Sequence, residues 1–167
     1  MNATTERTCQ IVSPFPIEGL GKLWLWLQTF KDETIDDFSP QTYAELVEKC
    51  RADSEAGAKS YAIIHDGQLV GCVWGEPVGN DVYSGHLVFE PYGLKPPEKL
   101  EATKQAIKCF FADGARKIRW MALSQNRAYR LFLRRLGAQF EGELKQETKQ
   151  EGALKDLLLF ASFPNGR

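Results

Sequence analysis

Two side chains that could move a proton lie close together in one predicted strand. His86 belongs to the strand-like run 82–89, and Glu90 follows His86 by four residues, so both side chains would face the same side. A free imidazole titrates near pH ~6.5, which suits a general base, and a carboxylate can serve the same purpose. Glu76, at the end of a preceding hairpin, is a third candidate. Taken alone, a histidine in a strand is more often structural than catalytic.

The remaining reactive side chains do not form a familiar site. The chain has two histidines, and its four cysteines include no closely spaced pair, so we expect no metal site. With so few histidines, no Ser/His/Asp or Cys/His arrangement is indicated. Scattered cysteines after a polar N-terminus without a signal-peptide core are typical of a reducing, cytoplasmic setting.

The composition predicts a single globular domain. The chain has 167 residues, of which 43% are hydrophobic and 26% are charged, and this length can bury a core without disulfides. We expect a flexible tail at 1–8 and one domain at 9–167. The net charge of −1 argues against a general nucleic-acid binder. No uncharged apolar run approaches the ~20 residues that cross a membrane.

Changes in hydrophobic period predict the elements that must position these side chains. Apolar residues at helical spacing predict helices, and short runs between turn residues predict strands. Asp66-Gly67 supplies the positive φ angles of a tight hairpin, and Ser39-Pro40 has the residue types that start a helix. In chain order we expect a strand at 9–13, a helix at 17–30, a loop at 31–38, a helix from 39, a hairpin at 60–75, a strand at 82–89, a helix at 98–113, a strand at 117–123, a helix at 126–136, and strands near 138–145 and 155–163 around a polar tip at 146–152. This order indicates an α+β domain whose mixed sheet is covered by helices.

One segment carries a family resemblance. The run 124–140 places Asn126 between a strand and a short helix, with Gly137 eleven residues after Asn126. This segment and the order of elements resemble the Gcn5-related N-acetyltransferase (GNAT) superfamily. The resemblance implies a central, mostly antiparallel mixed sheet with a splayed parallel strand pair, 82–89 and 117–123, flanked by four helices. It also implies acetyl-CoA as a co-substrate, without a metal.

The resemblance assigns cofactor-binding roles to residues on both sides of that strand pair. Leu87, Val88 and Phe89 occupy the place where unpaired backbone groups bind the pantetheine arm of the cofactor. Asn126 matches a residue that hydrogen-bonds the cofactor or holds the strands apart, and an asparagine at this position also caps a helix. Both roles can coexist.

In the family, a tyrosine usually donates a proton to the departing thiolate. Alignment on Asn126 places this position near Leu133, which cannot donate a proton. Tyr129 lies one helical turn earlier and is the candidate acid, although an amphipathic surface position explains it as well. His86 or Glu90 would then act as the base.

The segment that should hold the cofactor's diphosphate departs from the family pattern. Family members have an Arg/Gln-x-x-Gly-x-Gly/Ala loop, whose N–H groups bind the diphosphate at a helix start. The matching segment 90–99 has no Gly-x-Gly, Pro96 and Pro97 each remove a donor, and the carboxylate after them repels phosphate. Lys95 and Lys99 could bind the phosphates instead, or the prolines simply begin a helix whose lysines are solvated.

We therefore predict an acyl-CoA-dependent N-acetyltransferase in which a small-molecule or protein amine attacks the thioester directly. The alternative is a catalytically degenerate protein of this fold that acts by protein contact. The segment 115–163 resembles small internal virion or assembly proteins of short-tailed bacteriophages, and Leu136-Gly137-Ala138 is closer to them than to the Leu-Gly-Phe of active acetyltransferases. A bacteriophage origin would place the protein in the host cytoplasm or the virion. A toxin-type acetyltransferase acting on transfer RNA is disfavoured by the near-neutral charge.

Two further features leave alternatives open. Arg127, Arg130, Arg134 and Arg135 form a basic helix face that could bind phosphates of coenzyme A, RNA or an acidic partner, or could be solvated. A homodimer through the last strands and a virion protein partner also stay open.

Overall fold

A seven-stranded sheet organises the described part of the chain. The computed structural model describes residues 9–31 and 39–165. The strand order is β1-β2-β3-β4-β5-β7-β6, and neighbouring strands are antiparallel except β4 and β5, which are parallel. This is the mixed, mostly antiparallel sheet that the sequence predicts. The strands are β1 (Gln10–Val12), β2 (Lys59–His65), β3 (Gln68–Gly79), β4 (Val82–Phe89), β5 (Lys117–Leu123), β6 (Gln139–Gln150) and β7 (Ala153–Ser162).

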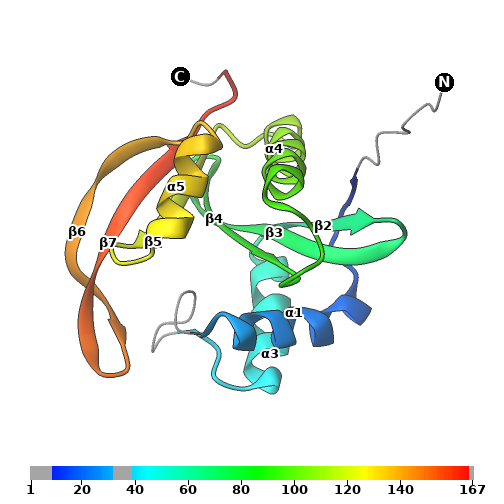
Figure 1. The fold of residues 1–167 in the computed structure, drawn as a ribbon, viewed down its shortest axis with the longest axis horizontal. Coiled ribbons are helices and arrows are strands. Elements are labelled where there is room, and N and C mark those ends of the chain that lie inside the picture. Colours follow the sequence, from blue (N-terminus) through cyan, green and yellow to red (C-terminus); the bar gives the residue numbers. More distant parts are fainter. Residues whose placement is uncertain (1–8, 32–38, 166–167) are drawn as a thin grey trace.

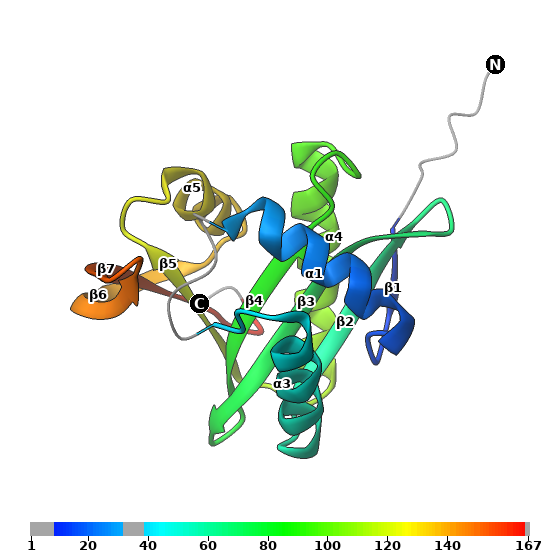
Figure 2. The ribbon, with the colours of Figure 1, turned by 90° about the horizontal axis from the view of Figure 1, so that it is seen from below.

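Four α-helices within the described segments cover the two faces of the sheet. α1 and α3 lie against one face, and α4 and α5 lie against the other (Figure 1 and Figure 2). The long β6–β7 ribbon curves past α5 at one end of the molecule (Figure 1). The helices are α1 (Leu20–Thr29), preceded by a short 3-10 turn η1 (Ile17–Gly19), α3 (Tyr43–Glu55), α4 (Pro96–Ala112) and α5 (Arg127–Arg135).

The two helix layers bury separate hydrophobic cores. On the side of α4 and α5, Trp120, Phe110 and Phe160 are fully buried. On the side of α1 and α3, Leu23 and Trp26 pack against the opposite face of β3 and β4. Burying a large apolar side chain stabilises a fold by roughly 1.5–3 kcal/mol. Both cores therefore hold the central strands firmly from either side.

Local capping decides where α3 begins. The helix starts at Tyr43, so the predicted start at 39–40 is wrong. The Thr42 side chain accepts a hydrogen bond from Glu45 N at 3.2 Å, and the Glu45 carboxylate accepts one from Gln41 N at 2.7 Å. This reciprocal box satisfies two backbone donors at once, which a Ser-Pro start does not.

Two-residue turns with positive φ connect the hairpins. Asp66 and Gly67 have φ angles of 49° and 75° and confirm the predicted β2–β3 turn. The last hairpin is tighter than the predicted tip at 146–152, because the turn consists of Glu151 and Gly152, with φ angles of 51° and 77°. Such turns match the right-handed twist of the flanking strands, so β6 and β7 continue to pair up to the turn.

Some sequence predictions fall outside the described residues. The predicted tail at 1–8 and most of the predicted loop at 31–38 lie there. The single domain at 9–167 stays a prediction.

The parallel strand pair is splayed, as the sequence predicts. β4 and β5 pair only from Val82–Lys117 to Gly85–Trp120. Beyond this point β4 remains paired with β3, and β5 remains paired with β7 through Leu123. The two strands therefore diverge, and the last residues of β4 face a gap on the β5 side.

Candidate functional site

The end of β4 presents backbone groups to this gap. Glu90 N donates to Val70 O at 2.9 Å, so this pair continues the hydrogen bonding between β3 and β4. Backbone groups alternate sides along a strand, so the N–H and C=O groups of Leu87 and Phe89 point away from β3, towards the gap. In the described ladder no residue of β5 pairs with 86–89. An extended ligand that contains amides can add to this edge as a further strand would.

Gly85 and Trp120 mark the point where the strands part. They are the last partners of the β4–β5 ladder, and a Cβ on Gly85 would lie 2.6 Å from Ile118 Cγ2 and 2.8 Å from Trp120 Cζ3. Both neighbouring side chains are fully buried. Trp120 Nε1 also donates to Ser162 Oγ at 2.9 Å, which holds the indole in place. Only glycine allows this close approach, and the gap opens directly after it.

A cavity of about 1330 Å³ adjoins the gap, with walls from α1, α3, α5 and the central strands. Small-molecule pockets usually measure roughly 300–1,000 Å³, so this space can hold a long ligand and a second molecule. Glu90 and Lys95 do not line it. The sequence-predicted residues on its walls are His86, Leu87, Val88, Phe89, Lys99, Asn126 and Tyr129.

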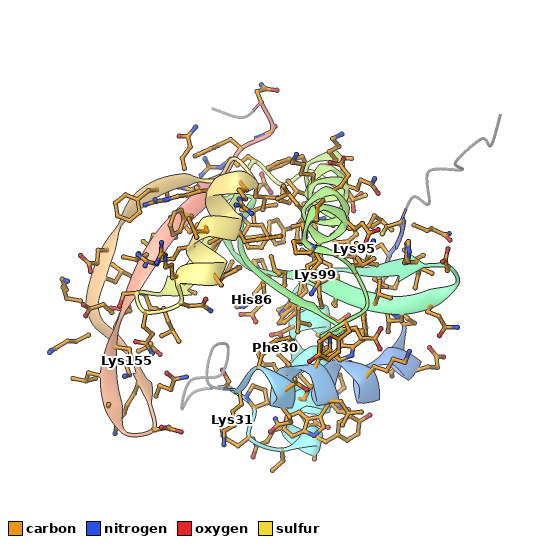
Figure 3. All side chains as sticks on the ribbon, in the orientation of Figure 1. Phe30, Lys31, His86, Lys95, Lys99 and Lys155 are labelled. Carbon is orange, nitrogen blue, oxygen red and sulfur yellow. The ribbon has the colours of Figure 1, made fainter. Side chains whose placement is uncertain are left out.

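His86 belongs to a polar cluster on the face covered by α1 and α3. Figure 3 shows it in the space between α5 and α1. Its Nε2 lies 3.6 Å from Glu76 Oε1, and its ring stacks on the indole of Trp74. The same Glu76 oxygen lies 2.8 Å from Lys49 Nζ, which also contacts Asp53 Oδ2 at 3.0 Å. Burial opposes the Lys49 charge, but the hydrogen bonds with both carboxylates outweigh burial and raise the pKa of Lys49.

Asn126 and Tyr129 face the cavity from the start of α5. Asn126 Oδ1 accepts a hydrogen bond from Tyr129 N at 2.9 Å, so the predicted capping role of Asn126 is confirmed. Burial raises the pKa of the Tyr129 hydroxyl, which therefore stays protonated at neutral pH. Within the described residues this hydroxyl has no hydrogen-bond partner and can donate to a ligand. Leu133 is fully buried and has no such access.

The loop before α4 keeps Glu90 and Lys95 away from the cavity. The Glu90 carboxylate lies against Gly93, where an added Cβ would be 2.8 Å from Glu90 Oε2. Lys95 is exposed, and its backbone N donates to Glu98 Oε2 at 2.7 Å. The spacing of Glu90 and His86 predicts that they share one side. Of the two, His86 lines the cavity, whereas the Glu90 carboxylate lies against Gly93 instead.

Lys99 is the predicted phosphate ligand that reaches the cavity. Its Nζ lies 5.5 Å from the centroid of the Phe89 ring, and burial lowers the pKa of its ammonium group. Figure 3 shows Lys95 and Lys99 close together near the start of α4. The arginines of α5 do not line the cavity.

Sequence reasoning named Glu76 and His86 but did not connect Lys49 with them. Trp74 and Glu76 are two residues apart in β3, so their side chains face the same side of the sheet. Their pairing with β4 depends on a register shift near Gly79, which has no sequence signature. Lys49 lies one helical turn before Asp53, and this spacing predicts only an ordinary ion pair on the helix surface.

The described segments, 9–31 and 39–165, contain no group of three or more His, Cys, Asp or Glu side chains that could hold a metal ion. None of their helices is both long and apolar enough to span a bilayer.

Known proteins match the fold of the chain but not its sequence. No family model and no curated protein matches the chain. The spermidine N-acetyltransferase of Vibrio cholerae, solved with CoA and spermine, has a TM-score of 0.79 at 12% identity, over 95% of this chain and 97% of that one. The ribosomal-protein-alanine N-acetyltransferase of Brucella melitensis has a TM-score of 0.78 at 14% identity, over 92% and 99% of the two chains. RimJ of Mycobacterium smegmatis, solved with CoA-disulfide, has a TM-score of 0.75 at 17% identity, over 94% and 82%.

Identities this low establish the fold alone. The chain has the predicted GNAT-like fold, a mixed sheet with a splayed parallel pair. The resemblance to bacteriophage proteins stays a prediction.

Proposed function

We propose that this chain, which has the GNAT-like fold, is an N-acetyltransferase that moves an acetyl group from a pantetheine thioester such as acetyl-CoA to an amine. The observation that carries the proposal is the edge of β4 after Gly85, which β5 leaves unpaired beside the cavity. The N–H and C=O groups of Leu87 and Phe89 are spaced to pair with the amides of a pantetheine arm. Solved structures of the same fold hold CoA or CoA-disulfide, which supports this assignment.

The side chains around the edge supply the proton transfers of such a reaction. The acceptor nitrogen attacks the thioester carbonyl carbon, the carbon–sulfur bond breaks, and the nitrogen loses a proton. His86, with Glu76 beside it, is the proposed base for that proton. Tyr129 is the proposed acid, because its protonated hydroxyl faces the cavity and can supply a proton to the departing sulfur. Glu90 is not proposed as a base, because it does not line the cavity.

The same wall supports an amine as the acceptor. Glu76 already holds a primary ammonium group, that of Lys49, at 2.8 Å within the cavity. A carboxylate in this position can equally receive the ammonium group of a substrate, next to the imidazole that would deprotonate it. A screen of small-molecule and protein amines distinguishes the two classes of acceptor.

A second candidate function has one observation in its favour. The loop before α4 lacks the Gly-x-Gly that holds a diphosphate, and Glu98 occupies the helix start. A protein of this fold that binds no donor and acts by contact, in a virion or as a homodimer, would need no such loop. This alternative predicts that no pantetheine thioester binds.

Acetyl transfer and binding can be tested together. Purified protein with acetyl-CoA and a panel of amines, read by mass spectrometry, should give N-acetylated product. Binding of CoA at 100 times its dissociation constant should stabilise the fold by roughly 2.7 kcal/mol. Absence of both product and stabilisation, at about 1 mM of CoA or of pantetheine, would contradict the proposal.

A matched pair of variants tests the edge itself. Leu87→Pro removes an N–H that points to the gap, whereas Leu87→Ala keeps it. Binding should weaken in Leu87→Pro by about tenfold or more and change little in Leu87→Ala. Equal binding by both variants would show that the ligand does not use this edge.

A further inference from the structure

We propose that this site recognises its donor through the pantetheine arm and one phosphate, and not through the diphosphate and nucleotide of coenzyme A. Its donors would then be acyl-phosphopantetheine thioesters as a class. Acetyl-CoA is one member of this class and would not bind more tightly than the others. This inference rests on the proposed acetyltransferase function and adds a statement about which part of the donor is bound.

The backbone donors that could hold a diphosphate are mostly absent or engaged. Pro91, Pro96 and Pro97 have no N–H. Glu90 N is bonded to the neighbouring strand, and Gly93 N donates to the carbonyl of Glu90 at 3.3 Å. The helix start before α4 is therefore not the cluster of free amides that binds a diphosphate in other proteins.

The chain's own carboxylates take the place that the diphosphate would need. Glu98 Oε2 accepts the hydrogen bond of Lys95 N at 2.7 Å, at the first turn of α4. This places a negative charge at the positive end of the helix dipole, where an incoming diphosphate would otherwise be stabilised. The Glu90 carboxylate lies in the same loop, close against Gly93. Two carboxylates next to a diphosphate would repel it.

One cation remains directed at the cavity from this end. Lys99 lies one turn into α4 and lines the cavity. Its Nζ is 5.5 Å from the centroid of the Phe89 ring, at the end of β4 that β5 leaves unpaired. An ammonium group that is partly removed from water gains more from a bound phosphate than an exposed one does, and burial indeed lowers the pKa of Lys99. One lysine matches one phosphate. The arginines of α5, which would have to bind further phosphates, do not line the cavity.

The test compares four probes by calorimetric titration of the whole protein: CoA, 4′-phosphopantetheine, pantetheine and 3′-phospho-ADP. We expect 4′-phosphopantetheine to bind within about threefold of CoA, and 3′-phospho-ADP not to bind at about 1 mM. CoA binding about 30-fold or more tighter than 4′-phosphopantetheine would overturn this inference and leave the acetyltransferase proposal standing. Absence of binding by all four probes would overturn both.

Lys99→Met tests the single phosphate contact. This variant should weaken binding of 4′-phosphopantetheine and CoA by about tenfold and leave pantetheine unaffected. Lys108→Met is the matched control, because Lys108 is an exposed lysine of the same helix outside the cavity. An equal loss of all three ligands, or no loss of any, contradicts the role of Lys99.

A variant that restores donors tests the blocked loop. The triple variant Pro96→Ala, Pro97→Ala, Glu98→Gln adds two N–H groups and removes a carboxylate charge at the start of α4. It should raise the preference for CoA over 4′-phosphopantetheine by about tenfold, with Glu101→Gln on the same helix as the control. An unchanged preference in a variant that is folded by circular dichroism would show that this loop does not decide donor recognition.

Discussion

The imidazole of His86 stacks on the indole of Trp74, with ring centroids 5.0 Å apart and ring planes inclined by 17°. The two residues are partners in the antiparallel register of β4 and β3. This stacking fixes the plane of the imidazole and leaves its Nε2 3.6 Å from Glu76 Oε1. A base must hold a fixed orientation towards the proton it removes, and here two strands provide that orientation.

Replacing His86 should therefore impair catalysis more than binding. His86→Gln is expected to lower kcat/KM for amine acetylation by about 10²-fold or more, since a positioned base contributes that order. The dissociation constant of CoA should change by less than about twofold. Steady-state kinetics and calorimetric titration measure the two quantities.

The other histidine provides the control for this variant. His65 lies on β2 with its Nδ1 3.8 Å from Cys9 Sγ, and it does not line the cavity. His65→Gln should retain activity. If both variants lose activity equally, His86 has no particular part in the reaction.

Tyr129→Phe should remove the proton donor without removing the ring that packs against the core. We expect kcat to fall by about 10²-fold, while CoA binding and thermal stability stay close to those of the parent protein. Tyr43→Phe, an exposed tyrosine at the start of α3, is the control. Full activity in Tyr129→Phe would mean that the departing sulfur obtains its proton elsewhere, for example from water.

Asn126 combines a helix cap with a place on the cavity wall, and two variants separate these roles. Asn126→Ala should cost about 1 kcal/mol of unfolding free energy, because Tyr129 N loses its acceptor. Asn126→Ser keeps an oxygen that can cap the helix, so stability should recover. If Asn126 also contacts the donor, Asn126→Ser should still bind CoA more weakly than the parent protein. Chemical denaturation measures the unfolding free energy, and calorimetric titration measures the affinity for CoA. If Asn126→Ser binds CoA as tightly as the parent protein, Asn126 acts only as a helix cap.

Gly85→Ala should destabilise the protein through overpacking. The added Cβ would lie 2.6 Å from Ile118 Cγ2, and neither Ile118 nor Trp120 has space to move. We expect a loss of about 1–3 kcal/mol in urea denaturation. Gly21→Ala on α1, where nothing lies within 4 Å, should have the opposite sign and stabilise by up to about 1 kcal/mol. A stable Gly85→Ala variant would contradict the tight contact at the point where the strands part.

Alkaline pH should weaken the fold through Tyr61. This tyrosine is buried, its hydroxyl donates to Asp113 Oδ2 at 2.5 Å, and burial followed by this hydrogen bond raises its pKa well above the ordinary value near ~10. The folded state therefore holds the proton more tightly than the unfolded state. The resulting stability is complete below pH ~10 and is lost as the pH rises towards the raised pKa. Denaturation from pH 8 to ~11 should show this loss, and Tyr61→Phe should flatten the curve. Parallel curves for the two proteins would refute the assignment.

Local patterns in the sequence determined most of the elements. The Asp66-Gly67 turn, the strand 82–89 and the strand 117–123 were predicted because turn residues and alternating apolar positions act over a few neighbours. The cap at Asn126 followed from the same kind of local signal. These features led to the fold, and the solved structures with the same fold agree with it.

Only the tertiary structure decided which side chains meet. Glu90 was placed at the site from its spacing and Lys95 from the family resemblance, but the Glu90 carboxylate lies against Gly93, Lys95 is exposed, and neither residue lines the cavity. Glu76 reaches both His86 and Lys49 because a strand register and the packing of α3 bring distant segments together. Residues close in sequence are positioned by local backbone geometry, whereas contacts between strands and helices depend on how complete layers pack, and no short pattern encodes that.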